Sequence, residues 1–276
     1  IVNLCIVKTL YNDDDNEIFY NIEDFVKYAV EQKNTTFIAH NGKAYDNWMV
    51  HKYIIKHTAH RPNKLILAGN KIVYMKVKSV RFIDSLNHIA QGLASFPKTF
   101  GLKELKKGFF PYLFNIQSNQ DYIGVIPDKK FFNMNAMSCD KLQEFNEWYS
   151  LQTGIYNFKN ELYEYCNSDV DILKRSMEIY INDAIVITGI NPLSCSTIAS
   201  YAMKVFRTNF INENQIAVLS KEEYDFCKRG FFGGRTEVFK LFQSWTNQQI
   251  EEGTYGKYVD IQSLYPSVQF FDELPC

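Results

Sequence analysis

The chain has 276 residues, 46% of them hydrophobic and 16% aromatic, and its 30 basic and 31 acidic side chains leave a net charge of -1. This composition excludes wholesale disorder and argues against a surface coated in basic side chains. No apolar run approaches the roughly 18 residues that span a bilayer, so we expect no membrane partner. Six scattered cysteines form no Cys-x-x-Cys pair, which favours reduced thiols of an intracellular protein over zinc or disulfide frameworks.

Strand-like and helix-like segments alternate in the first half of the chain. Helical spacing over 22–31 and 46–57 separates segments whose apolar or period-two pattern predicts strands. The predicted strands cover residues 1–10, 36–39, 72–77 and 80–83. Alternation of this kind is typical of an α/β fold.

The pattern becomes helical after Cys139, with helices predicted over 139–153, 158–187 and 196–210. Beyond Lys228 the sequence turns strand-rich again. We therefore expect an α/β domain over residues 1–190 and the opening of a second domain over 191–276.

The most specific segment is Asp-Ile-Gln-Ser-Leu-Tyr-Pro-Ser at 260–267. Asp260 is predicted to end an apolar strand over 258–260, where its oxygens can hold a hard cation. A tight turn then delivers Tyr265 directly before Pro266, which can open a helix as its first residue. Backbone N–H groups of Ser263, Leu264 and Tyr265 can face phosphates at such a helix start. The plain alternative is a strand, a turn and a helix.

A second constellation involves two segments far apart in the sequence. Asn41 ends a buried strand, and Asp46 follows at the top of the next helix, although Asn-Gly can mark a simple turn and Asp46 a helix cap. Tyr165 and Asp169 are four apart on a predicted helix and so project from one face. Each segment alone leaves its function open.

Taken in order, these segments resemble a known family. DxxSLYPS looks like motif A of family B DNA polymerases, and Asn-x3-Tyr-Asp followed by Tyr-x3-Asp looks like their DEDDy 3′-5′ proofreading exonuclease. The resemblance implies an RNase H-like exonuclease domain over 1–190 that lacks its first motif. Residues 191–276 would hold linker helices and the beginning of a polymerase palm.

The resemblance assigns roles residue by residue. It implies that Asp46, Asp169 and Asp260 hold Mg²⁺ or Mn²⁺ in two-metal sites, that Tyr165 orients the attacking water, and that Tyr265 excludes ribonucleotides. Lys107 matches a lysine near the exonuclease phosphate, and Ser263, Leu264 and Tyr265 match nucleotide-binding positions. The expected DNA contacts are Asn41, Ser85, Leu86, Phe231, Gly233 and Gly234, with Phe231 standing where the family has tyrosine and Asp84 left without a role.

Two motifs of the family are not found in this sequence. The exonuclease DxE would lie upstream of Ile1, and the polymerase YxDTDS would lie downstream of Cys276. We therefore expect a fragment cut at both ends, and a poor exonuclease by itself, because a cation stripped of half its anionic ligands gains too little to repay dehydration.

Two further segments, 100–111 and 233–238, resemble the protein-primed branch of adenoviruses, linear plasmids and Maverick or Polinton transposons. The resemblance implies DNA and dNTPs as partners, a terminal protein as a candidate primer, and a nuclear, viral or organellar setting. Two alternatives stay open, namely a stand-alone DEDDy exonuclease and a degenerate fragment that only binds single-stranded DNA.

Overall fold

The structure is a computed structural model that describes residues 3–14, 16–102, 108–234 and 236–273. The chain divides into two compact units, Ile1–Ile216 and Ala217–Cys276. Residues 191–216 therefore fall in the first unit, and the functional division expected at residue 190 stays a prediction. The first unit is mixed α/β, which confirms the expected fold class in its coarse form.

A four-stranded sheet forms the centre of the first unit, with strand order β3-β6-β5-β4. Strands β3 and β6 are parallel, with Ala39 beside Asp84, whereas β6–β5 and β5–β4 are antiparallel. The strand bounds are β3 (Thr36–Ala39), β4 (Lys64–Ala68), β5 (Lys71–Val77) and β6 (Val80–Asp84). The carboxyl ends of β3 and β6 consequently meet at one edge of the sheet.

Helices α1 (Ile22–Glu31) and α2 (Asp46–His57) pack against this sheet through a shared core. Val26 and Ile54 are almost fully buried there, beside side chains of β5 and β6. Asn21 caps α1 by accepting a hydrogen bond from the Asp24 backbone, which satisfies one of the unpaired N–H groups of the first turn.

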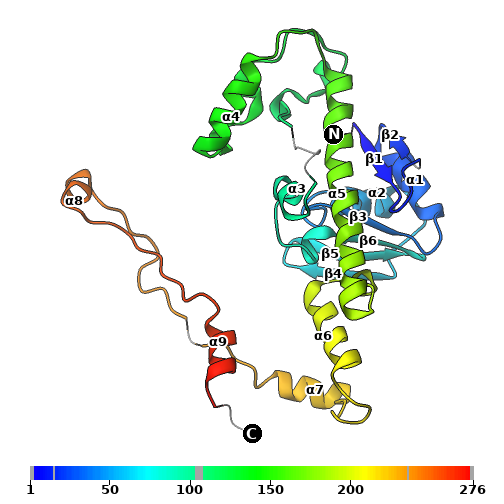
Figure 1. Cartoon of the computed structure of the whole chain (residues 1–276), viewed down its shortest axis with the longest axis vertical. Helices are drawn as coiled ribbons and strands as arrows, with labels where there is room; N and C mark the ends of the chain where they lie inside the picture. The colour runs from blue at the N-terminus through cyan, green and yellow to red at the C-terminus, as the bar shows by residue number, and fades with distance from the viewer. Residues whose placement is uncertain (1–2, 15, 103–107, 235, 274–276) are drawn as a thin grey trace. The chain divides into compact units, whose positions relative to one another are not determined.

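Helix α5 (Phe158–Thr188), 31 residues long, is the longest element among the described residues and crosses the sheet in Figure 1. Its buried side chains Ile172, Met177 and Ile181 form a core with Leu93, Phe96 and Ile38 of β3. The small antiparallel sheet of β1 (Cys5–Lys8) and β2 (Asn16–Phe19) lies beside it, and Lys8 Nζ is 2.7 Å from Asp171 Oδ1.

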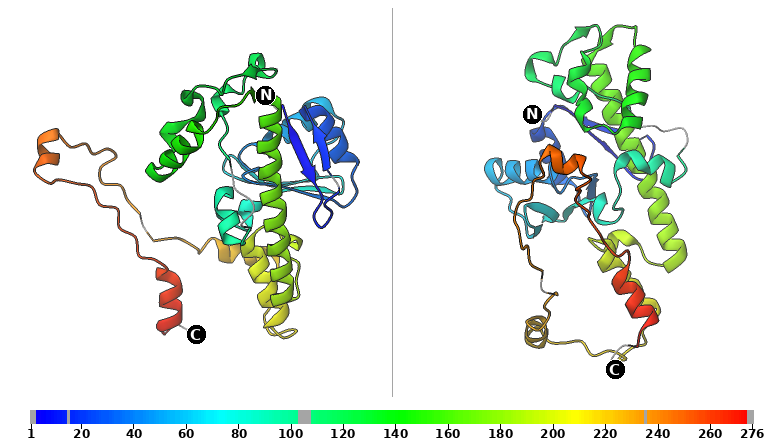
Figure 2. Two further views of the ribbon diagram at one scale, coloured as in Figure 1. Left: turned by 45° about the horizontal axis from the view of Figure 1, so that its top comes forward. Right: turned by 90° about the vertical axis from the view of Figure 1, so that its left-hand side faces the viewer.

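An aromatic-rich segment, residues 108–157, gathers at the N-terminal part of α5, as both views in Figure 2 show. Phe110, Tyr156 and Phe158 are buried together, and Phe132 packs against Phe145 of α4 (Cys139–Ser150) in a further ring cluster. The remaining short elements here and before it are β7 (Ile123–Gly124), β8 (Tyr156–Asn157), α3 (Phe96–Thr99), η1 (Ser85–Asn87), η2 (Leu93–Ser95), η3 (Tyr112–Phe114), η4 (Gln117–Asn119), η5 (Lys129–Phe132) and η6 (Met134–Ala136).

Helix α5 ends at Gly189, whose φ of 73° is the left-handed conformation that favours glycine. The chain turns through η7 (Pro192–Ser194) and enters α6 (Ile198–Asn209), capped by Thr197. The Tyr201 hydroxyl is 2.7 Å from Thr188 Oγ1 and ties α6 back to the end of α5.

The second unit contains α7 (Lys221–Lys228), α8 (Asn247–Glu251) and α9 (Leu264–Phe271) and, in the described residues, no strand. The prediction of strands beyond Lys228, including one over 258–260, is therefore wrong for this structure. An extended segment becomes a strand only when a neighbour accepts and donates its backbone hydrogen bonds, and the described part of this unit supplies no such pairing.

Most predicted elements of the first unit are confirmed, with α1, α2 and β3 at the predicted bounds. Among the described residues, four strands were not predicted, namely β2, β4 and the two-residue strands β7 and β8. Every residue of β4 is exposed, so no alternation of buried and exposed side chains marks it in the sequence. Across the described residues, no helix combines the length and apolarity that a membrane crossing requires.

We expect His88 to make the stability of the first unit depend on pH. Its ring is buried, 3.3 Å from the Tyr180 hydroxyl, and burial lowers its pKa below the ordinary 6.5. The folded state then binds this proton less readily than the unfolded state. The free energy of unfolding should fall as pH drops below about 6.5, by at most about 1.4 kcal/mol per pH unit.

Urea unfolding between pH 8 and pH 5 measures this slope. His88→Phe should reduce the slope, whereas His57→Gln, at an exposed histidine of α2, should leave it unchanged. Equal slopes in all three proteins would mean that His88 is not the titrating group.

Candidate active site

The turn between β3 and α2 is built around Asn41 and Gly42. Asn41 has a φ of 60°, and the Gly42 carbonyl accepts a 2.9 Å hydrogen bond from the Asn47 backbone. A Cβ at Gly42 would lie 2.8 Å from the Ala39 Cβ, so a larger residue would push the turn away from β3. The predicted Asn-Gly turn is thus observed, and it delivers Asp46 to the start of α2.

Asp46 is the first residue of α2, not its cap. Tyr45 occupies the cap position without a side-chain hydrogen bond, so the capping alternative for Asp46 is wrong. A carboxylate in the first turn interacts favourably with the positive end of the helix. Asp46 is an exposed residue, yet the protein atoms around its carboxyl group and the nearby Asp84 raise its pKa.

Tyr165 and Asp169 lie one turn apart on α5, as the sequence predicted. The Tyr165 ring stacks on Phe110 with centroids 5.1 Å apart, and its hydroxyl is hydrogen-bonded to the hydroxyl of Tyr112. Burial, Asp169 and Tyr112 all raise the pKa of Tyr165. The phenol is therefore held in place and protonated.

The two predicted metal ligands of the first unit, Asp46 and Asp169, are more than a hundred residues apart in the sequence. Both carboxylates act electrostatically on the thiol of Cys166. Burial, Asp169 and Asp46 raise the pKa of the Cys166 thiol to about 11. Burial, Cys166 and Asp46 raise the pKa of Cys5, on β1, to about 12. Asp46 and Asp169 thus share one electrostatic environment, bordered by two neutral thiols.

Few side chains around Asp46 and Asp169 could ligate a metal ion. Within the described residues, no group of three or more histidine, cysteine, aspartate or glutamate side chains is arranged to hold a metal ion. Two carboxylates suit a hard divalent cation in the kind of atom they offer, because Mg²⁺ prefers oxygen ligands and usually takes one or two carboxylates from protein.

The predicted single-strand contacts Ser85 and Leu86 follow β6 directly. Ser85 is fully buried, and its hydroxyl lies 2.9 Å from Nδ1 of His40. Leu86 is half-buried. The Ser85 side chain therefore faces inward, and Leu86 and Asn41 are the more accessible members of this group.

Residues 260–267 bring two of the predicted polymerase residues together in the second unit. Asp260 and Tyr265 line one hollow of about 540 Å³, whose other lining residues are Val259, Ile261, Leu264 and Pro266. Helix α9 begins at Leu264, after Ser263 in the left-handed region, so Pro266 is its third residue and not its first. Proline is tolerated there because N–H groups of the first turn have no intrahelical partner.

The other predicted site residues join neither the group around Asp46 and Asp169 nor the hollow at Asp260 and Tyr265. Lys107 lies outside the described residues. Phe231, Gly233 and Gly234 lie on an exposed segment of the second unit, and neither glycine has a positive φ or an atom within 4 Å of an added Cβ.

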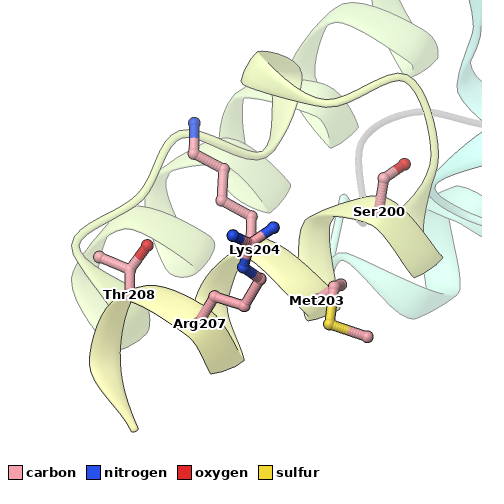
Figure 3. Close-up of a pocket in the computed structure, with 5 residues that line it drawn as sticks. All are labelled: Ser200, Met203, Lys204, Arg207 and Thr208. Carbon is pink, nitrogen blue, oxygen red and sulfur yellow. The ribbon is translucent and has the colours of Figure 1, made fainter. Parts of the chain in front are cut away.

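A further hollow, of about 380 Å³, lies on the outer side of α6 (Figure 3). Ser200, Met203, Lys204, Arg207 and Thr208 line it, and no carboxylate is among them. Lys204 Nζ donates to Ser194 Oγ at 2.9 Å. This surface has no metal ligand and is not a candidate for the chemistry above.

Sequence reasoning missed three residues of the first site, namely Tyr112, Cys5 and Cys166. Tyr112 lies 53 positions before its partner Tyr165, in a segment without regular periodicity. Cys166 stands inside the Tyr-x3-Asp pattern that the sequence did single out, and its position next to Tyr165 was the available signal. The five cysteines among the described residues are all free, with Cys139 and Cys227 exposed and the other three half-buried.

Comparison with known proteins identifies the family of the chain. The model of DNA polymerase type B, organellar and viral, matches residues 26–276. The chain belongs to this family of type B DNA polymerases. No solved structure is significantly similar to the chain.

Several curated relatives bear the name probable DNA polymerase. One from Podospora anserina is 25% identical over 190 residues, covering 68% of this chain and 15% of the relative. One from Ascobolus immersus is 28% identical over 229 residues, covering 76% and 18%. One from Agaricus bitorquis is 23% identical over 259 residues, covering 88% and 30%. The chain thus spans less than a third of the length of these relatives.

The arrangement of Asp46 and Asp169 can be checked through thiol chemistry. Because only thiolates react, Cys5 and Cys166 should alkylate with iodoacetamide at pH 8 more than about 100-fold slower than the exposed Cys139 and Cys227. Asp46→Asn and Asp169→Asn should each speed the labelling of Cys166, since each removes a negative neighbour. Mass spectrometry of labelled peptides measures all four rates.

Asp140→Asn, at an exposed acid of α4, is the matched control and should leave the labelling rate of Cys166 unchanged. If neither substitution at Asp46 or Asp169 affected Cys166, the two carboxylates would not flank this thiol.

Proposed function

We propose that the chain is part of a DNA-directed DNA polymerase whose first unit is an RNase H-like 3′-5′ proofreading exonuclease of the DEDDy type. The observation that carries this proposal is the shared environment of Asp46 and Asp169, with Tyr165 beside Asp169. Membership in the type B polymerase family supports it, as does the order of the motifs along the chain.

In the proposed exonuclease, Asp46 and Asp169 hold Mg²⁺ or Mn²⁺. When bound, such a cation activates water and stabilises charge on the scissile phosphate. Tyr165, kept protonated by its raised pKa and held by Phe110 and Tyr112, donates a hydrogen bond that orients the attacking water. Asp46 must ionise to bind the cation, and its raised pKa makes that binding weaken as pH falls.

In the proposed polymerase site, Asp260 holds a metal ion and Tyr265 lies across the sugar of an incoming dNTP. Both residues line one hollow, so a single ligand can contact the carboxylate and the ring. Backbone N–H groups of Leu264 and Tyr265, in the first turn of α9, suit a phosphate. The bulk of the ring would exclude a 2′-hydroxyl.

The proposed substrates are DNA with a single-stranded primer end, a template and dNTPs. Priming by a terminal protein, and replication of a virus, plasmid or transposon, extend the proposal and rest on the resemblance of residues 100–111 and 233–238 to the protein-primed branch.

One observation favours a second candidate, a fragment that binds single-stranded DNA without cutting it. Among the described residues the first site offers two carboxylates, and a two-metal site needs ligands for two cations about 3.5–4 Å apart. On this hypothesis Asn41 and Leu86 would still contact DNA, but Asp46 and Asp169 would not support hydrolysis.

The 276-residue chain and a longer parent protein distinguish these candidates. With magnesium and a labelled single-stranded primer, we expect slow digestion by the chain alone and fast digestion by the parent. Asp46→Ala or Asp169→Ala in the parent should slow digestion by more than about 100-fold, because even outer partners of a metal site are worth 10–100-fold. Asp140→Ala serves as the control. A parent that digests DNA equally well without Asp46 would exclude this exonuclease site.

The Tyr265 assignment is tested by sugar selection in the parent polymerase. Tyr265→Ala should raise ribonucleotide insertion relative to deoxyribonucleotide insertion by about 100-fold or more, because the ring that would collide with the 2′-hydroxyl is gone. Tyr265→Phe keeps the ring and should retain the selectivity. Unchanged selectivity in Tyr265→Ala would refute the steric role while leaving the exonuclease proposal intact.

A further inference from the structure

Asp84 is a fully buried carboxylate at the last position of β6. It lies beside Ala39, the last residue of β3, in the parallel pairing of the two strands. Because both strands end at this edge, the loop after β3 and the turn after β6 begin side by side. Asp84 is thus located between two segments that are far apart in the sequence.

Three backbone N–H groups donate to this carboxylate. The Asp84 Oδ1 accepts from Asn41 at 3.0 Å and from Leu86 at 2.8 Å, and Oδ2 accepts from Lys43 at 3.0 Å. Both oxygens are therefore occupied by fixed donors, which stabilise the buried charge. A carboxylate that already accepts three hydrogen bonds has little capacity left to ligate a cation. Its role is to hold the backbone segments that donate to it.

The anchored segments carry the residues proposed to contact single-stranded DNA. Asn41 has a φ of 60°, a left-handed conformation that asparagine adopts more readily than other residues apart from glycine. Two side-chain contacts join the same segments, His40 to Ser85 at 2.9 Å and Lys43 to Asn87 at 3.2 Å. The loop after β3 and the turn after β6 therefore form one connected unit around Asp84.

We propose that Asp84 is a positioning residue that holds Asn41 and Leu86 in fixed mutual register, so that both contact one single-stranded DNA end. Asp84 itself touches no substrate. The inference rests on the proposed function, because it takes Asn41 and Leu86 to be DNA contacts. It adds a residue to which the family resemblance gave no role, and it excludes Asp84 as a further metal ligand.

Asp84→Asn in the full 276-residue chain tests the proposal. An amide has one acceptor oxygen and an NH₂ group, which would face one of the three donors. We expect about tenfold weaker binding of an oligo-dT strand in EDTA, with faster hydrogen exchange at the Asn41, Lys43 and Leu86 amides. Because EDTA removes divalent cations, weaker oligo-dT binding in EDTA would reflect lost positioning of the DNA contacts and not lost metal affinity. If Asp84→Asn does not fold, Asp84→Glu keeps the charge and displaces its oxygens.

Ile54→Val is the matched control, because it removes a methyl group from the core on the α2 side without touching either loop. It should lower the melting temperature while leaving oligo-dT binding and the three amide exchange rates, relative to global unfolding, unchanged. If it weakened binding as much as Asp84→Asn did, the effect would be one of general stability and the proposal would be wrong.

Asn41→Ala separates failure of this inference from failure of the proposed function. We expect Asn41→Ala to weaken binding, and the double variant with Asp84→Asn to bind hardly worse than either single variant, since both act on one contact. Weaker binding in Asn41→Ala with normal binding in Asp84→Asn would overturn only the positioning role. Normal binding in both would exclude a single-strand site here and the inference with it.

Discussion

The packing of α5 is the interaction on which the first unit depends. Ile172, Met177 and Ile181 bury one side of this helix against α3 and β3, each contributing about 1.5–3 kcal/mol relative to exposure. The same helix presents Asp171 to Lys8 of β1 and Tyr165 to the aromatic segment. Because Asp169 lies between these contacts, its position follows from the packing on both sides of it.

The site that results is electrostatically unfavourable without a partner. Asp46 and Asp169 both help raise the pKa of the Cys166 thiol to about 11, and Asp46 helps raise that of Cys5 to about 12. Asp84 adds a third negative charge near Asp46. Like charges held close together disfavour ionisation, and a bound cation would reverse that effect.

The sequence predicted those parts of the structure that are determined locally. Helix α2 was predicted at its observed bounds, because the Asn-Gly turn and the helical spacing lie next to each other in the chain. The Tyr112–Tyr165 contact could not be predicted, because it depends on how an irregular segment folds back onto α5. The prediction of a strand before Asp260 was wrong because it rested on a local pattern alone. A strand also requires a pairing partner, which a local pattern cannot supply.

Parallel pairing of β3 with β6 explains why the candidate site lies at one edge of the sheet. Antiparallel strands would send the two loops to opposite edges, whereas this pairing places Asn41, Asp46 and the turn after Asp84 together. No single motif contains that information, because the two strand ends are 45 residues apart, as Ala39 and Asp84 show. Asp84 fixes the loop after β3 relative to the turn after β6, because its carboxylate accepts hydrogen bonds from the backbone amides of Asn41 and Leu86. The site therefore depends as much on this strand pairing as on the residues of the motifs.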